Sequence, residues 1–294
     1  MNNPFPFSLR WINVQCFEIR LPNGKVILTD PQFSDPLSGF ERAKNYKIPE
    51  CFHLKRDVLK QVDYIIINHT HCDHLIDLGY FMKKFNPLLI CHEAVAYELA
   101  RAFDIPFTSI YAVGSQCSYE FEDFSLQTLN AMHMPQDFVY SNMTNIFTES
   151  YGIEGPGTME IGQLGGLFSM NYMLTTRENL RIGFFAGRMD SPSYPGIRQM
   201  AALKPNVLLR QIPVRLPQNP AEIFANEILT TGAQLMLPMH HESFEAELNA
   251  QRHQMLTEIF DRINKRLEEK RFAGQAFWPE RGKWYGLQIG IQTR

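Results

Sequence analysis

Three histidines and one aspartate lie within six consecutive residues of the sequence. They are His69, His71, Asp73 and His74, and they directly follow an apolar stretch. Imidazole and carboxylate groups are the ligands that Zn²⁺ and similar divalent ions prefer. Without a cation, four such groups packed together would compete for protons and lose their hydration. The sequence therefore predicts a metal site here, and the alternative is a solvated polar turn.

The spacing within this cluster predicts two positions around the metal centre. Residues two apart in an extended segment point to the same side, so His69 and His71 share a direction. Asp73 and His74 then turn toward a second position as a helix begins. The preceding run 64–67 is apolar throughout, which is typical of a strand buried on both faces. The ligands are thus expected between this strand and a helix over 75–84.

The order of the remaining elements indicates two sheets with helices outside them. Strands are expected at 9–19 and 25–29, joined by a hairpin turn, and strands then alternate with helices twice. A later helix is expected to have Asn219 as its N-cap and to end at Gly232. This order predicts an α+β fold, an αββα four-layer sandwich of two mixed β-sheets flanked by helices.

The sequence also indicates the domain organisation. Residues 1–294 show no internal repeat, low-complexity tract or long linker, so a single domain is predicted. Within it, residues 134–166 are irregular and rich in glycine. Such a long irregular stretch is typically functional, so it is expected to be a lid or substrate-loop insertion.

Composition limits the classes of partner and location. The net charge of −3 and the absence of a basic stripe argue against nucleic acid as a partner. No apolar run approaches the ~18 residues that a membrane span needs, and no secretory signal is recognisable, so a soluble cytoplasmic protein is expected. The five cysteines are odd in number and irregularly spaced, which does not indicate a disulfide framework. A small-molecule substrate is expected, and the sequence is compatible with a homo-oligomer.

The histidine cluster resembles the signature of the metallo-β-lactamase fold superfamily, H-x-H-x-D-H after a hydrophobic strand. Three further stretches are similar to that superfamily. Residues 26–31 look like its early strand ending in Asp-Pro, 164–186 like its mid-chain pair of strands, and 238–240 like its last ligand motif. The branch that the chain resembles most is that of L-ascorbate 6-phosphate lactonase and related small metal-dependent hydrolases. The resemblance implies an αββα sandwich, in agreement with the order of elements.

The resemblance implies three further metal ligands. His133 fits the histidine that follows a mid-chain strand, and the alternative is a hydrogen-bonded loop histidine. His240 fits the last histidine, while its neighbour His241 could substitute for it, support it or contact the substrate. The bridging carboxylate departs from the pattern, because Arg188 stands where the superfamily has aspartate, and Asp190 is the candidate replacement. A guanidinium cannot bind a cation, so Arg188 would repel the metal or bind an anionic substrate group.

The ligand set predicts a metal-dependent hydrolase of small esters, lactones or phosphodiesters, with a lactone preferred through the resemblance. One or two Zn²⁺ ions, or else Mn²⁺, would lower the pKa of water to about 7, and the hydroxide would attack the substrate. Asp73 is expected to act both as a ligand and as the catalytic proton acceptor. The alternatives are a degenerate metal-binding relative with little or no activity, which Arg188 motivates, and an iron-dependent oxidoreductase on the same fold.

Two charged residues outside the ligand set have open assignments. Asp30, which precedes Pro31, either orients a metal-site histidine or belongs to an ordinary turn. Arg210, in a predicted strand, either meets a phosphate or carboxylate group or is a solvated surface arginine, which is the commoner case.

Overall fold

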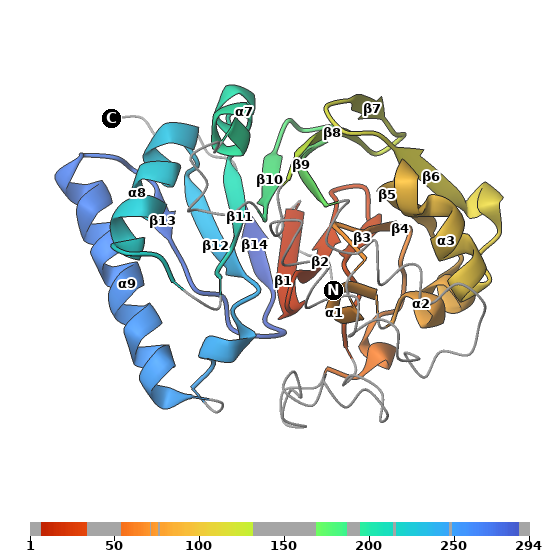
Figure 1. The fold of residues 1–294 in the computed structure, drawn as a ribbon, viewed down its shortest axis with the longest axis horizontal. Coiled ribbons are helices and arrows are strands. Elements are labelled where there is room, and N and C mark those ends of the chain that lie inside the picture. Colours follow the sequence, from red (N-terminus) through yellow and green to blue (C-terminus); the bar gives the residue numbers. More distant parts are fainter. Residues whose placement is uncertain are drawn as a thin grey trace, which may run out of the picture.

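The computed structural model describes residues 7–33, 54–70, 72–75, 77–131, 169–186, 195–213, 216–246 and 249–287. Within them lie two seven-stranded sheets that pack face to face (Figure 1). Helices α2 (Leu78–Phe85) and α3 (Glu93–Phe103) cover the outer face of the first sheet, and α8 (Pro220–Thr231) and α9 (Ala250–Glu269) cover that of the second (Figure 1). The predicted α+β four-layer sandwich is therefore confirmed.

The first sheet is mixed, with strand order β14-β1-β2-β3-β4-β5-β6. Its strands are β1 (Phe7–Asn13), β2 (Cys16–Arg20), β3 (Val26–Thr29), β4 (Tyr64–Ile66), β5 (Leu88–His92), β6 (Ile110–Val113) and β14 (Tyr285–Leu287). Pairing is antiparallel from β14 to β3 and parallel from β3 to β6. The parallel half is the part that needs cover on both faces, and α2 and α3 supply the outer cover.

The second sheet is also mixed, with strand order β13-β12-β11-β10-β9-β8-β7. Its strands are β7 (Ser118–Glu120), β8 (Phe124–Asn130), β9 (Met170–Thr176), β10 (Arg181–Phe185), β11 (Val207–Gln211), β12 (Leu235–Met239) and β13 (Gln275–Ala276). Pairing is antiparallel from β7 to β10 and parallel from β10 to β13. Helix α7 (Pro195–Leu203) precedes β11.

Buried side chains form three layers of core, one between the sheets and one under each helical layer. Successive side chains of β11 contribute to two different core layers. Val207 and Leu209 lie in the cluster between the sheets, whereas Leu208 lies in the cluster beneath the helices. Successive strand residues point to opposite faces, so an apolar run is required wherever both faces are covered.

Two local expectations differ from the structure. The helix expected over 75–84 is divided into α1 (Cys72–Leu75) and α2, with Asp77 between them. The Asp77 carboxylate accepts a hydrogen bond from the backbone N–H of Phe33 at 2.6 Å and pairs with Arg56 at 3.2 Å. Asn219 does precede α8, but it is left-handed and makes no side-chain capping hydrogen bond. The start of α2 thus coincides with tertiary contacts of Asp77, and the start of α8 with a left-handed backbone at Asn219. Neither helix begins with the side-chain cap that local sequence preference favours.

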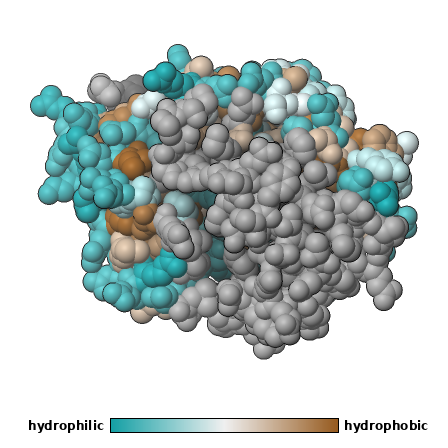
Figure 2. Space-filling view, in the orientation of Figure 1, coloured by the Kyte–Doolittle hydropathy of each residue, from teal (hydrophilic) through white to brown (hydrophobic). Residues whose placement is uncertain are grey.

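Some expectations fall outside the described residues. Residues 134–166 are among these, so their role as a lid stays a prediction, as does the single-domain organisation. None of the described helices is long and apolar enough to cross a membrane. On the face in Figure 2, hydrophobic residues of the described chain occur as small patches among hydrophilic ones, as is usual on the surface of a folded protein.

Candidate metal centre

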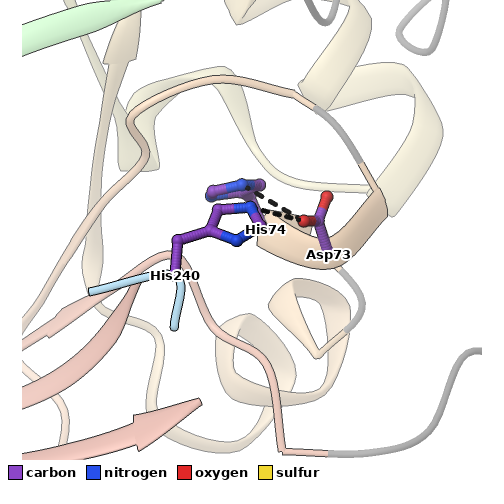
Figure 3. Close-up of side chains that lie close together, drawn as sticks. All are labelled: Asp73, His74 and His240. Carbon is purple, nitrogen blue, oxygen red and sulfur yellow. Dashed lines mark ion pairs between the residues drawn. The ribbon is translucent and has the colours of Figure 1, made fainter. Parts of the chain in front are cut away.

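Asp73, His74 and His240 bring one ligand atom each to a common point, and these atoms all lie within 4.8 Å of one another (Figure 3). The Oδ2 atom of Asp73 lies 3.5 Å from Nε2 of His74 and 3.2 Å from Nε2 of His240. Asp73 and His74 belong to α1, which follows β4, whereas His240 directly follows β12. The cluster therefore joins the carboxyl ends of strands from two different sheets.

The turn after β12 is held by the hairpin between β1 and β2. His240 has a left-handed backbone with φ of 57°, and its N–H donates to the carbonyl of Val14 at 2.7 Å. Val14, at the tip of that hairpin, is also left-handed. A left-handed residue reverses the local chain direction, so the adjacent histidines 240 and 241 leave the strand toward different surroundings.

His69 lies against the cluster without belonging to the three-residue group. Its ring centroid is 3.9 Å from that of His74, and its Nδ1 is 2.8 Å from Oδ1 of Asn68. Four of the predicted site residues lie outside the described residues, and their roles stay predictions: His71, His133, Arg188 and Asp190. The structure thus brings together one ligand pair from the H-x-H-x-D-H motif and the predicted last histidine.

Two buried carboxylates lie behind the clustered histidines. Asp30 Oδ2 is 3.4 Å from His74 Nδ1, and Asp30 Oδ1 accepts a hydrogen bond from the N–H of Asn68 at 2.7 Å. Of the two assignments left open for Asp30, orientation of a site histidine therefore fits its place. Glu242 lies behind His240, with its Oε1 3.2 Å from Nδ1. Sequence reasoning missed Glu242, and the signal was a carboxylate two residues after a predicted ligand.

The electrostatics of this cluster favour positive charge. Burial alone would lower the pKa of His240, but the carboxylates of Glu242 and Asp73 outweigh it and hold that pKa well above the usual range. Burial raises the pKa of Asp30, and the neighbouring His74 opposes this in part. Metal binding requires neutral imidazole, so a divalent cation at Nε2 of His240 would take the place of the proton that these carboxylates favour.

His241 occupies a different environment from His240. Its ring stacks on Trp11 with a centroid separation of 3.9 Å and meets the edge of Trp278 at 5.3 Å. The side chain is 0% exposed, and burial holds its pKa well below the usual range. Substitution of His241 for His240 as a ligand does not fit this placement. Contact of His241 with a substrate stays a prediction, and burial between two tryptophans argues against it.

The donor set fits a divalent cation. Two imidazoles and one carboxylate are an ordinary ligand set for Zn²⁺ and similar ions. Nε2 of His74 is buried and makes no hydrogen bond, and it faces the Asp73 carboxylate at 3.5 Å. Buried polar atoms are normally hydrogen-bonded, so an imidazole nitrogen in this position suits a site completed by a cation. Among the residues that the structure describes, no other group of His, Cys, Asp and Glu meets in this way.

The comparison of sequences agrees with this geometry. A family model described as the metallo-beta-lactamase superfamily matches residues 9–133, which include α1 with Asp73 and His74. This part of the chain is similar to the metallo-β-lactamase superfamily. A metal-dependent hydrolase of the UPF0173 group from Thermodesulfovibrio yellowstonii is 30% identical over 95 residues. That match covers 32% of this chain and only 30% of the relative's own length.

Solved structures extend the metallo-β-lactamase fold over the whole chain. The metallo hydrolase Igni18 from Ignicoccus hospitalis has a TM-score of 0.64 at 14% identity, covering 97% of this chain and 99% of that one. The diiron β-hydroxylase CmlA from Streptomyces venezuelae has a TM-score of 0.57 at 12% identity, covering 98% of this chain and 55% of that one. At these identities the likeness shows the fold alone, and the lactonase-like branch of the superfamily stays a prediction.

Arg210 meets a carboxylate, which is one of its two sequence-based assignments, and the other assignment, a solvated surface arginine, is wrong. Its side chain is buried in the metallo-β-lactamase fold, with Nε donating to Glu227 Oε2 at 2.7 Å and Nη2 donating to Oε1 at 3.2 Å. Arg210 is therefore not solvated, and its guanidinium is already engaged by a carboxylate of α8. The commoner surface placement fails here because β11 is an inner strand covered on both faces.

Truncation of Glu227 to alanine is expected to lower the free energy of unfolding by about 3–5 kcal/mol, because it leaves the buried guanidinium of Arg210 without its carboxylate. Urea denaturation followed by circular dichroism measures the change. Glu268→Ala, at an exposed position of α9, is the control and should change stability by less than about 0.5 kcal/mol. Equal stability of the two variants would show that the buried pair contributes nothing.

Proposed function

We propose that the protein is a metal-dependent hydrolase whose cation is held by Asp73, His74 and His240. The observation that carries this proposal is the convergence of Asp73 Oδ2 with the Nε2 atoms of both histidines at the junction of the two sheets. The matched relative from Thermodesulfovibrio yellowstonii is described as a metal-dependent hydrolase, which supports the same class of activity. Zn²⁺ is the proposed ion, in one or two copies, with Mn²⁺ as the alternative.

Asp73, His74 and His240 would hold a divalent cation, which would lower the pKa of water and polarise a carbonyl or phosphoryl oxygen. The side chains divide the remaining work according to their chemistry. Asp73 is the carboxylate of the group and its side chain is 13% exposed, so it can accept a proton from water beside the substrate. His74 and His240 are buried and hold position, and Asp30 limits the rotation of the His74 ring from behind.

The substrate class of this proposal is a small ester, lactone or phosphodiester. A lactone is preferred because of the resemblance to the lactonase branch, and Arg188 is the proposed contact for an anionic group on the substrate. A cytoplasmic location, as expected from the sequence, completes the proposal.

One other activity is favoured by a specific observation. The diiron β-hydroxylase CmlA has a similar fold, which supports an iron-dependent oxidoreductase as the second candidate. A degenerate metal-binding relative is the third, since Arg188 stands where the superfamily has a bridging aspartate. The three candidates differ in metal content and turnover.

Protein purified without added metal is expected to contain at least one equivalent of zinc or manganese. Because the cation supplies the activated water, chelation followed by dialysis should abolish hydrolysis of a panel of lactones, esters and phosphodiesters. Addition of Zn²⁺ or Mn²⁺ should then restore it. Elemental analysis by mass spectrometry and initial-rate assays are the measurements.

Two results would contradict the hydrolase proposal. Stoichiometric iron with visible absorption and no hydrolysis would favour the oxidoreductase. Sub-stoichiometric metal, with no turnover of any member of the panel before or after metal addition, would favour the degenerate relative. Chelator-treated protein that is dialysed and reconstituted with Mg²⁺ alone controls for damage during treatment.

A further inference from the structure

Glu242 contacts the centre, and no sequence motif singled it out. It begins the short helix η6 (Glu242–Phe244), two residues after His240, and is 8% exposed. Its Oε1 lies 3.2 Å from Nδ1 of His240, on the side of the ring opposite to Nε2, which faces Asp73. The ring of His240 thus lies between two carboxylates, one at each nitrogen.

Glu242 is buried, and its contact with His240 involves one of its two carboxylate oxygens. Its second carboxylate oxygen, Oε2, is buried and has no hydrogen-bond partner. Burial of a carboxylate is unfavourable unless both oxygens are well compensated, and an apolar side chain of similar size is often more favourable at such a position. A buried carboxylate that contacts a metal-site histidine is therefore better explained by a role at the site than by a role in folding.

A second pair in the same centre has the same arrangement. Asp30 stands behind His74 as Glu242 stands behind His240, with a carboxylate oxygen 3.4 Å from Nδ1. In both cases Nε2 is directed at Asp73. A metal-bound histidine commonly has a carboxylate at its other ring nitrogen, which fixes the ring and makes the bound nitrogen a stronger donor.

We propose that Glu242 is a positioning residue for His240 that fixes the direction of Nε2 toward the cation and strengthens its donation. His240 has particular need of such a partner. Asp73 and His74 share the helical backbone of α1, whereas His240 is the only clustered residue contributed by the turn after β12. This inference rests on the proposed function, because it requires that the centre hold a cation.

The test measures cation affinity in the full-length protein at one fixed pH. Metal-free wild type, Glu242→Gln and Glu242→Ala are titrated with Co²⁺ in competition with a chromophoric chelator. Gln keeps the size of the side chain and removes its charge, whereas Ala removes the contact as well. We expect affinity to fall about 10-fold or more in Glu242→Gln and toward about 100-fold in Glu242→Ala. The visible absorption bands of bound Co²⁺ should also shift in Glu242→Gln.

The matched control is Glu245→Gln. Glu245 lies in the same segment, and its Oε1 is 3.7 Å from Nε2 of His241, a histidine outside the cluster. The affinity of Glu245→Gln for Co²⁺ should stay within about a factor of two of wild type, since the ring that Glu245 faces, His241, lies outside the cluster. Thermal unfolding of each metal-free variant shows whether it is folded. If Glu242→Ala does not fold, Glu242→Gln decides the matter.

The outcomes separate this inference from the function on which it rests. Wild-type affinity and an unchanged Co²⁺ spectrum in both Glu242 variants would overturn the role of Glu242 and leave the metal site intact. Failure of the wild-type protein to bind Co²⁺ or Zn²⁺ would overturn the proposed function, and this inference with it. If Glu245→Gln lost as much Co²⁺ affinity as Glu242→Gln, the loss would be a general effect of charge near the site. That result would also overturn the positioning role of Glu242.

Discussion

Asp73→Asn is expected to lose the divalent cation and to hydrolyse the substrate panel at no more than background rate. Asparagine keeps the size of the side chain but removes the negative charge that faces Nε2 of both His74 and His240. Loss of a supporting contact typically costs 10–100-fold in metal affinity, so loss of a direct charged ligand should cost more than about 100-fold. Chelator competition and initial rates measure the two effects.

Asp57→Asn is the control for that variant. Asp57 is 81% exposed and pairs with Lys84 on the surface, so removal of its charge should leave metal content and rate unchanged. Stoichiometric zinc with an undiminished rate in Asp73→Asn would contradict the assignment of Asp73 as both ligand and proton acceptor.

The adjacent histidines 240 and 241 should respond in opposite ways to substitution. His240→Ala is expected to reduce metal affinity by more than about 100-fold, since Nε2 of His240 is one of the three converging ligand atoms. His241→Phe should bind metal within a few-fold of wild type. The substituted ring can keep the stacking on Trp11, and the pKa of His241 is already well below the usual range, so no charge is lost near neutral pH.

Isothermal titration with Zn²⁺ on both metal-free variants distinguishes the two histidines. Retention of metal by His240→Ala together with its loss in His241→Phe would transfer the ligand role to His241. The melting temperature of each metal-free variant serves as the control, because a fold disrupted by either substitution would lose metal for an unrelated reason.

Local sequence indicates the two candidate ligands that a single turn supplies. Asp73 and His74 are neighbours on α1, and a buried strand, β4, comes before them as the apolar run 64–67 indicates. His240 was predicted only through the resemblance of its Pro-Met-His motif, because nothing local shows which strand end will meet α1. The αββα architecture was predictable because hydrophobic periodicity and the order of strands and helices determine which faces must be buried.

The remaining contacts of the centre depend on packing between distant parts of the chain. Glu242 contacts His240 in a turn whose backbone is left-handed at His240 and hydrogen-bonded to Val14. The burial of His241 depends on Trp11 and Trp278, which come from opposite ends of the sequence. Arg210 is buried because Glu227 of α8 meets it, and a preference for exposed arginine cannot show this.

The hydrogen bond from His240 to Val14 has a mechanical consequence for the molecule. It connects His240, at the end of β12 in the second sheet, to the tip of the β1–β2 hairpin in the first sheet. The first sheet also contains β4, the strand that precedes α1. An ion held by Asp73, His74 and His240, as proposed, would act as a cross-link between the two halves of the sandwich. Separation of the halves would break the coordination, so the free energy of cation binding would add to the cohesion of the sheets.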